Sequence, residues 1–376
     1  MSVRLVTSAL LIVAAAGCTA PVADDTPQQL NDGWAVGSLA AAGFDGHSIA
    51  AVVQAIEDGA YRNTHALLIE HDGALVYEVY FNGTDERWGD PLGERAIGRD
   101  SLHDLRSISK SVTSLVLGIA LGDQADSRLS TPLVGFFPDR DASPGAEQVT
   151  LYHALTMTAG LAWNEMTVPY TSEENDEIQL YATTDPVGYV LSRPVENAAG
   201  ETWYYNGGLS QVIAGVVQQI TGMTADAYAA EALFGPLGIT NYEWLGDPAW
   251  DPPMPAAASG LRLRARDLAK IGSLVLHGGR WNGARIVPEA WIEASTRRHV
   301  QEVGDWSNDG MWGYGYQWWV GALPDGRAVI AGYDNGNQRV FVVPDEQLVV
   351  TIFAGEYDVG GGHSNRLFEQ ILNARP

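Results

Sequence analysis

The stretch that decides the fold is Leu105-Arg106-Ser107-Ile108-Ser109-Lys110-Ser111-Val112-Thr113-Ser114. Apolar residues continue at helical spacing through Ala120 and stop at Gly122, which predicts a buried helix with a Ser-x-x-Lys tetrad on its first turn. A spacing of three residues places Ser107 and Lys110 on the same helix face. The sequence therefore predicts a serine and a lysine side by side at the start of a core helix.

This pairing suits nucleophilic catalysis. A serine hydroxyl is a weak nucleophile unless a base accepts its proton, and a lysine can be that base only where burial lowers its pKa from about 10.4. Of the 22 basic residues, only Lys110 and Lys270 are lysines, so Lys110 is retained where an arginine would keep its proton. The alternative interpretation is a capping serine beside a solvated lysine.

Apolar runs bounded by turn residues predict four strands, at 66–69, 75–81, 339–343 and 348–353. Helices are expected at both ends of this set, one capped by Ser48 and one at 365–372. The pattern indicates an α/β fold in which an antiparallel sheet carries the terminal helices on one face.

The body is expected to span residues 44–376. Residues 44–106 and 234–376 form its α/β part, and residues 107–233 are mostly helical in pattern and form an all-α domain. At 376 residues the chain is long enough for such a composite.

The N-terminal segment resembles an export signal. Residues 1–17 combine Arg4 with a short apolar run, and Cys18 follows a glycine as in bacterial lipoproteins. We expect a lipid on Cys18, a tether over 18–43, and a protein exported to the periplasm or cell envelope, touching a membrane only through that anchor. An ordinary secretory peptide cut before Cys18 is the alternative.

Charge and composition exclude other classes. The net charge of −24 argues against nucleic acid as a partner. The eight histidines lack metal-ligand spacing and the single cysteine offers no thiolate cluster, so neither a metal nor a cofactor is expected.

The stretch around Ser107 resembles the active-site helix of the serine β-lactamase and penicillin-binding-protein superfamily, in its class C-like branch. The sequence is most similar to the esterases and aminohexanoate-dimer (nylon-oligomer) hydrolases, and the likeness continues through 151–161 and 260–272. This resemblance implies a β-lactamase-like fold with the active site between the sheet and the all-α domain. It also implies an exported serine hydrolase that cleaves an ester or amide of a small molecule through an acyl-enzyme on Ser107.

The Tyr-x-Asn motif of the family fits two registers. The letters Tyr204-Tyr205-Asn206 select Tyr204, whereas the offsets from Trp203 and from a later Thr-Gly pair favour Tyr205. In the favoured register Tyr205 works with Lys110 as general base and acid, while Tyr204 and Asn206 contact substrate. Gly207 then stands where the family has asparagine, which argues against amide and β-lactam recognition.

The family's Lys/His-Thr/Ser-Gly motif is absent in literal form. Comparison with the esterase and nylon-hydrolase branch puts Gly332-Tyr333-Asp334 at its place, so that the N–H groups of Asn335 and Ser107 form the oxyanion hole, in a register that can shift by two residues. Tyr170 matches a loop that contacts substrate in nylon-oligomer hydrolases.

Two other functions stay open. A β-lactamase or DD-peptidase acting on cell-wall chemistry is the alternative enzyme, although no lysine or histidine replaces the missing carboxylate-binding motif. A catalytically silent surface lipoprotein is the alternative without chemistry, and the presence of both Ser107 and Lys110 argues against it.

Overall fold

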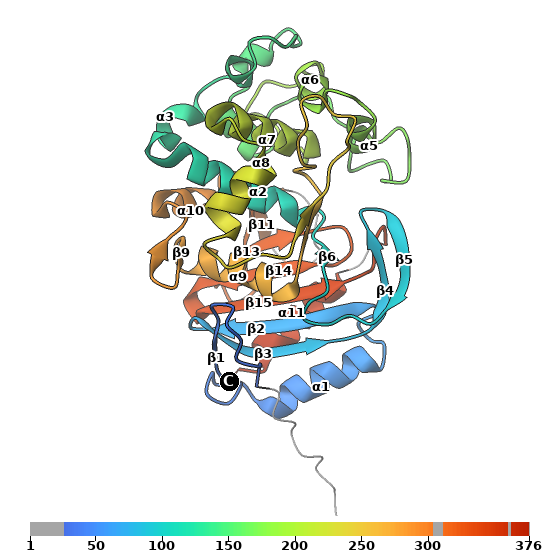
Figure 1. Cartoon of the computed structure of the whole chain (residues 1–376), viewed down its shortest axis with the longest axis vertical. Coiled ribbons are helices and arrows are strands. Elements are labelled where there is room, and N and C mark those ends of the chain that lie inside the picture. Colours follow the sequence, from blue (N-terminus) through green and yellow to red (C-terminus); the bar gives the residue numbers. More distant parts are fainter. Residues whose placement is uncertain (1–25, 304–310, 360–361, 376) are drawn as a thin grey trace, which may run out of the picture.

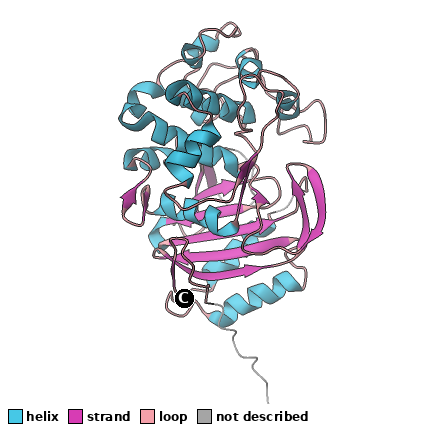
Figure 2. Ribbon diagram, in the orientation of Figure 1, coloured by secondary structure: helices cyan, strands magenta, loops and turns pink. Residues whose placement is uncertain are grey.

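The computed structural model describes residues 26–303, 311–359 and 362–375. Figure 1 shows a large sheet with helices stacked above it and α1 beneath it, and Figure 2 shows that the upper part is mostly helical while the lower part combines the sheet with helices next to it. This is the β-lactamase-like α/β arrangement that the sequence predicts.

An eight-stranded mixed sheet forms the base. Its order is β1-β3-β2-β15-β14-β13-β12-β11, and every neighbouring pair is antiparallel except β1 with β3. The strands are β1 (Ala35–Val36), β2 (Thr64–His71), β3 (Ala74–Tyr80), β11 (Met311–Tyr314), β12 (Trp319–Ala322), β13 (Ala328–Tyr333), β14 (Arg339–Val343) and β15 (Leu348–Ala354). The four strands predicted from sequence are confirmed and lie next to one another as β3, β2, β15 and β14.

Helices cover both faces of this sheet. On α9 (Ala265–Leu276), a Cβ built at Gly272 would lie 2.8 Å from the side chain of Val340. On α11 (His363–Asn373), Phe368 stacks on Phe341 with ring centroids 4.0 Å apart. Neighbouring residues of a strand point to opposite faces, so α9 and α11 lie on opposite sides.

The terminal helices share one face, as predicted. Helix α1 (Gly46–Glu57) packs against α11. Its cap is Asp45 and not Ser48, because the Asp45 carboxylate accepts hydrogen bonds from the N–H groups of His47 and Ser48.

The other elements connect or cover the sheet. The helices are α2 (Ile108–Leu121), α3 (Ala125–Leu129), α4 (Leu151–Leu155), α5 (Asp176–Tyr181), α6 (Pro186–Leu191), α7 (Gly207–Thr221), α8 (Ala225–Ala229) and α10 (Glu289–Ser295). The short strands are β4 (Gly83–Arg87), β5 (Asp90–Arg95), β6 (His103–Asp104), β7 (Glu243–Trp244), β8 (Leu261–Leu263), β9 (Arg280–Trp281) and β10 (Ala284–Arg285).

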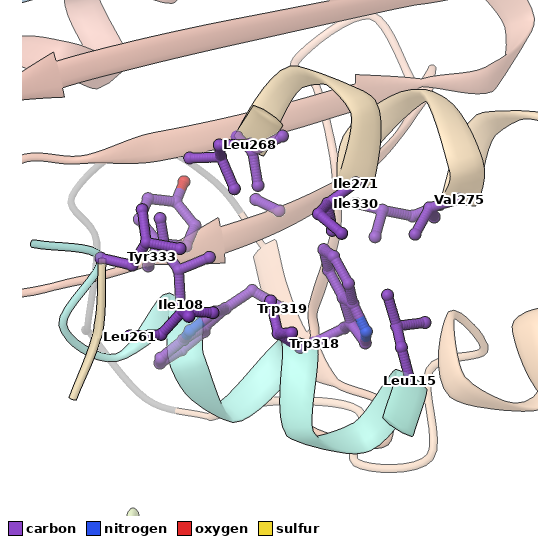
Figure 3. Close-up of a cluster of buried hydrophobic side chains, with 14 of the residues drawn as sticks. Ile108, Leu115, Leu261, Leu268, Ile271, Val275, Trp318, Trp319, Ile330 and Tyr333 are labelled. Atoms are coloured by element: carbon purple, nitrogen blue, oxygen red, sulfur yellow. The ribbon is translucent and has the colours of Figure 1, made fainter. Parts of the chain in front are cut away.

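Helix α2 joins the two regions. It packs on α7 within the helical region, while its residues Ile108 and Leu115 point toward α9 and the sheet in Figure 3. From α9, Leu268 and Ile271 point into the same buried cluster. The first turn of α2 is therefore held between the sheet and the helices.

The tether was predicted to run to residue 43, but residues well before that point are packed against the body. Trp34 is only 2% exposed and packs edge-on against Trp281, with ring centroids 4.9 Å apart. The next residues form β1, which pairs with β3. Pro27 is also buried, and Arg266 contacts the Gln28 carbonyl oxygen and the Asp32 carboxylate. The packed body therefore includes the described residues from Pro27 on, and Cys18 with residues 1–17 lies outside the described residues.

None of the helices in the described ranges combines the length and the apolar character needed to cross a bilayer.

Candidate active site

Ser107 stands immediately before α2, at the end of a strained turn. Arg106 has a positive φ of 43°, which is unfavourable for a residue with a side chain. The Ser107 side chain makes no capping hydrogen bond, so its hydroxyl is available to other groups. The predicted helix start is confirmed, and the interpretation of Ser107 as a capping serine is wrong.

Lys110 lies beside Ser107, as the three-residue spacing predicts. Its Nζ is 3.0 Å from Ser107 Oγ and 3.1 Å from the carbonyl oxygen of Ala258. The residue is only 1% exposed, so the interpretation of a solvated lysine is also wrong.

Tyr205 completes this group. Its hydroxyl is hydrogen-bonded to Ser107, and its ring centroid lies 4.8 Å from Lys110 Nζ. Burial, with a further contribution from Glu165, raises the pKa of Tyr205 well above its ordinary value. Tyr204 is half-buried, and its backbone N–H donates to Met157. The structure thus brings Tyr205, in the favoured register, to the serine.

A cavity of about 440 Å³ opens at Ser107, and a second of about 420 Å³ shares Ser107, Tyr170, Asn335 and Asp358 with it. Both have the size of a small-molecule site. The first is walled by Met166, Val168, Pro169, Tyr205 and Tyr333, the second by Trp88, Ile178 and Tyr181. The serine therefore lines both of two adjoining cavities, which leaves room for a substrate on either side of it.

Asn335 lies across the cavity from α2, on the loop between β13 and β14. Its side-chain amide is fixed by Asp358: Nδ2 donates to the carboxylate at 2.7 Å, and the Asp358 N–H donates to Oδ1 at 2.8 Å. Within the described part of the chain, the backbone N–H groups of Ser107 and Asn335 have no hydrogen-bond acceptor. Two free donors at one cavity are what an oxyanion hole needs, and the assignment of Ser107 and Asn335 to it stays a prediction.

Residues 49–363 match the model of the family described as Beta-lactamase. The chain belongs to the Beta-lactamase family.

The relatives of this family member are hydrolases. It is 25% identical, over 73% of its own length and 71% of the relative's, to the 6-aminohexanoate-dimer hydrolase of Paenarthrobacter ureafaciens. Its fold matches a candidate 6-aminohexanoate-dimer hydrolase from Bacillus anthracis with a TM-score of 0.67 at 21% identity, covering 85% of this chain and 80% of that one. It matches a family VIII carboxylesterase with a TM-score of 0.66 at 16% identity, and the match covers 87% of this chain and 96% of that one. The chain is thus a serine hydrolase, related to esterases and amidases.

A buried pair of glutamates, which sequence reasoning missed, extends the site. Glu165 Oε2 accepts hydrogen bonds from the N–H of Gly207 at 2.6 Å and from Trp163 Nε1 at 2.7 Å. The Glu165 side chain is also hydrogen-bonded to Glu177. Burial, followed by the charge of Glu177, raises the pKa of Glu165 to about 8. Glu165 therefore keeps its proton over most of the physiological range.

Gly207 makes room for this pair. A Cβ at this position would lie 3.2 Å from Glu165 Oε2 and 3.3 Å from the Glu177 carboxyl carbon. The glycine at the family's asparagine position therefore leaves room for the Glu165 and Glu177 carboxyl groups. It was also the one signal in the sequence that another side chain occupies the space of the asparagine.

The other residues that were predicted to contact substrate differ in where the structure places them. Tyr170 lines both cavities, and its hydroxyl donates to Glu165 Oε1 at 2.9 Å. Asn206 is buried and caps α7, because its Oδ1 accepts the N–H of Leu209. Among the described residues that line the two cavities, neither Tyr204 nor Asn206 appears, so the substrate contacts predicted for them are not supported.

Asp334 occupies the place of the missing basic motif. Its Oδ1 accepts the N–H of Gln338 at 2.8 Å, and Arg339 lies 3.4 Å away. Burial raises the pKa of Asp334 well above its ordinary value. Among the described cavity-lining residues only Arg106 is basic, and Glu86 and Asp104 already pair with it.

Exchanging each neighbouring tyrosine for phenylalanine separates their roles. Tyr205→Phe removes the hydroxyl bonded to Ser107 and keeps the ring, so kcat should fall by about 10²–10⁴-fold, as for a lost general base. Tyr204→Phe is the matched control and should retain kcat within a few-fold. Steady-state kinetics on one activated ester measure both, and a collapse confined to Tyr204→Phe would reverse the assignment.

Glu165 predicts a pH dependence of stability. Folded Glu165 keeps its proton to a pH of about 8, whereas the unfolded carboxyl loses it near 4.5, so the folded state binds more protons between these values. The free energy of unfolding should therefore fall as the pH rises from 4.5 to 8. Glu165→Gln should flatten this slope, measured by urea unfolding at several pH values.

The exposed Glu201→Gln serves as control and should keep the slope of the parent protein. Equal slopes in all three proteins would show that Glu165 is already ionised in the folded state.

Proposed function

We propose that this hydrolase cleaves esters, and amides with good leaving groups, through an acyl-enzyme on Ser107. The observation that carries the proposal is the contact of Ser107 Oγ with both Lys110 Nζ and the Tyr205 hydroxyl at the junction of two cavities. A hydroxyl with two proton-accepting neighbours beside a substrate-sized space is equipped for acyl transfer.

In the first step, Ser107 Oγ attacks the substrate carbonyl carbon and its proton passes to the Lys110–Tyr205 pair. The developing oxyanion accepts hydrogen bonds from the N–H groups of Ser107 and Asn335. As the carbonyl re-forms, the bond to the leaving group breaks and the pair returns the proton to the departing oxygen or nitrogen.

In the second step, water attacks the acyl-enzyme. The Lys110–Tyr205 pair accepts a proton from the water and then gives it to Ser107 Oγ as the acid product leaves. Because both cavities adjoin at Ser107, one can take the acyl group and the other the leaving group. Tyr170, held by Glu165, contacts bound substrate in both.

Charge in the cavities favours neutral or cationic substrates. A substrate carboxylate would meet Asp358 and the buried Asp334, while Arg106 is already paired with Glu86 and Asp104. An unpaired buried anion is costly. This argues against β-lactams and cell-wall peptides, whose recognition in the family uses the missing basic motif.

We also propose that the protein is exported and anchored by a lipid on Cys18. The support is the apolar run that precedes this cysteine in the sequence. Esters that reach the cell surface are then its substrates.

Covalent labelling tests the nucleophile. A fluorophosphonate probe should label the protein at Ser107, as read by peptide mass mapping, and Ser107→Ala should lose both labelling and ester hydrolysis by at least about 10³-fold. The nearby buried Ser111→Ala, whose hydroxyl contacts only the Gln317 carbonyl, is the control and should be labelled normally. Labelling elsewhere, or full turnover without Ser107, would overturn the proposal.

A series of esters tests the substrate class. Nitrophenyl esters of hexanoic acid, 6-aminohexanoic acid and adipic acid have similar length and carry an apolar, a positive or a negative end. We expect kcat/KM for the anionic ester to be at least about tenfold below the others, with the gap narrowing at high salt. Preference for the anionic ester would restore the β-lactamase or DD-peptidase alternative.

A further inference from the structure

A cluster of three buried side chains lies outside the active site. His65 comes from β2, Asp85 from β4 and His103 from β6, and one nitrogen or oxygen atom of each lies within 4.8 Å of the other two. His65 Nδ1 is 2.7 Å from His103 Nε2, and Asp85 Oδ1 is 3.5 Å from the same nitrogen. Three separate strands thus direct possible metal ligands at one point.

The outer contact of His65 fixes where its proton lies. His65 Nε2 is 3.1 Å from Asn63 Oδ1. The orientation of the Asn63 amide is set by Thr84, whose N–H donates to Oδ1 at 2.9 Å and whose carbonyl accepts from Nδ2 at 2.8 Å. Because Oδ1 can only accept, His65 Nε2 carries the hydrogen. In the neutral ring, Nδ1 then presents a lone pair to His103.

His103 has the same arrangement. Its Nδ1 is 3.1 Å from the carbonyl oxygen of Asp104, which also can only accept, so Nδ1 carries the hydrogen and Nε2 presents a lone pair. The side chain of Gln338 approaches the same Nδ1 at 3.4 Å, and turning its amide over would present an oxygen that suits this hydrogen.

Two lone pairs and a carboxylate oxygen therefore face one another in a dry interior, which requires a positive species between them. We propose that His65, Asp85 and His103 bind a divalent transition metal ion of the zinc class. Two imidazoles and one carboxylate form a ligand set typical of such ions. In each histidine the other ring nitrogen donates to a carbonyl oxygen, which is how metal-binding histidines are oriented.

The cluster needs only a small adjustment to hold the ion. Zinc–nitrogen bonds of about 2.0–2.1 Å in tetrahedral geometry separate two nitrogens by about 3.3 Å, so the rings must part by roughly half an ångström. Arg95 holds Asp85 Oδ2 at 3.1 Å, while Oδ1 lies 3.5 Å from His103 Nε2 and accepts one hydrogen bond, from the Tyr357 hydroxyl at 3.3 Å, which leaves a second lone pair for the metal. Sequence reasoning expected no metal because the three residues share no local spacing.

The ion would act on structure rather than on the reaction. His103 lies four residues before Ser107 in the segment that leads into α2, and its ring stacks on Phe353 of the central sheet, with centroids 4.7 Å apart. Joining His103 to β2 and β4 fixes this segment against the sheet. Metal binding should therefore stabilise the fold, because an ion that binds only the folded chain adds to its stability.

Metal content and spectroscopy test the proposal. The full-length protein without an affinity tag is treated with a chelator, then loaded separately with Zn²⁺ and Co²⁺. We expect about one equivalent of Zn²⁺ by elemental analysis, a higher melting temperature with added Zn²⁺, and the visible absorption of tetrahedral Co²⁺. Asp85→Asn and His103→Gln should each weaken binding by at least about tenfold, whereas the exposed His47→Gln should bind like the parent.

Less than a tenth of an equivalent in the parent, with no thermal shift, would overturn the proposal and leave a shared proton between the rings. Equal binding by the parent and the Asp85 and His103 variants would also overturn it, as adventitious binding elsewhere. If those variants do not fold, the stoichiometry and Co²⁺ spectrum of the parent protein decide the question.

Discussion

The burial of one lysine is the constraint on which the site depends. Lys110 is almost completely shielded from water, and its Nζ donates to a hydroxyl and a carbonyl oxygen, those of Ser107 and Ala258. A buried amine is tolerated only when its surroundings are fixed, because desolvation is costly and must be offset by well-placed acceptors. The packing of α2 between α7 and the sheet supplies that rigidity. The other lysine, Lys270, shows the contrasting solution, since it is buried in an ion pair with Asp267 at 3.2 Å.

Much of the fold was predictable from local pattern. The strands at its centre are continuous apolar runs ended by turn residues, and the terminal helices have clear amphipathic spacing, so their periodicity identifies them. The N-terminal boundary was not predictable, because Trp34 sits in a polar stretch and becomes buried through Trp281, about 250 residues later in the chain. The cap of α1 was misplaced for a simpler reason, since Asp45 and Ser48 are both good caps and sequence alone does not rank them.

The active site, too, was predictable only in part. Ser107 and Lys110 were predictable because one helical turn fixes their separation. The spacing of Tyr205 from Trp203 and from the later Thr-Gly pair predicted that Tyr205, in the favoured register, joins Ser107 and Lys110. Glu165 and Glu177 were not predictable, because Glu177 lies in the acidic stretch 173–177 and Glu165 in a segment without regular periodicity, and only the tertiary fold buries the two together. Asn206 illustrates the converse, since a residue that suits substrate recognition by type is used to cap α7.

Gly207 stands where the family has an asparagine, and this difference explains why the Glu165–Glu177 pair and the loop that carries Tyr170 form one unit. An asparagine side chain would fill the space of the Glu165 carboxyl, and Glu165 in turn holds the hydroxyl of Tyr170. An amide side chain at this place can orient a polar substrate directly, whereas Glu165, whose pKa burial raises to about 8, keeps its proton near neutral pH and uses its carboxyl oxygens to hold Tyr170 and the N–H of Gly207. The site therefore has a buried carboxyl group that positions a neighbouring tyrosine where the family has an amide, next to the nucleophile and its base.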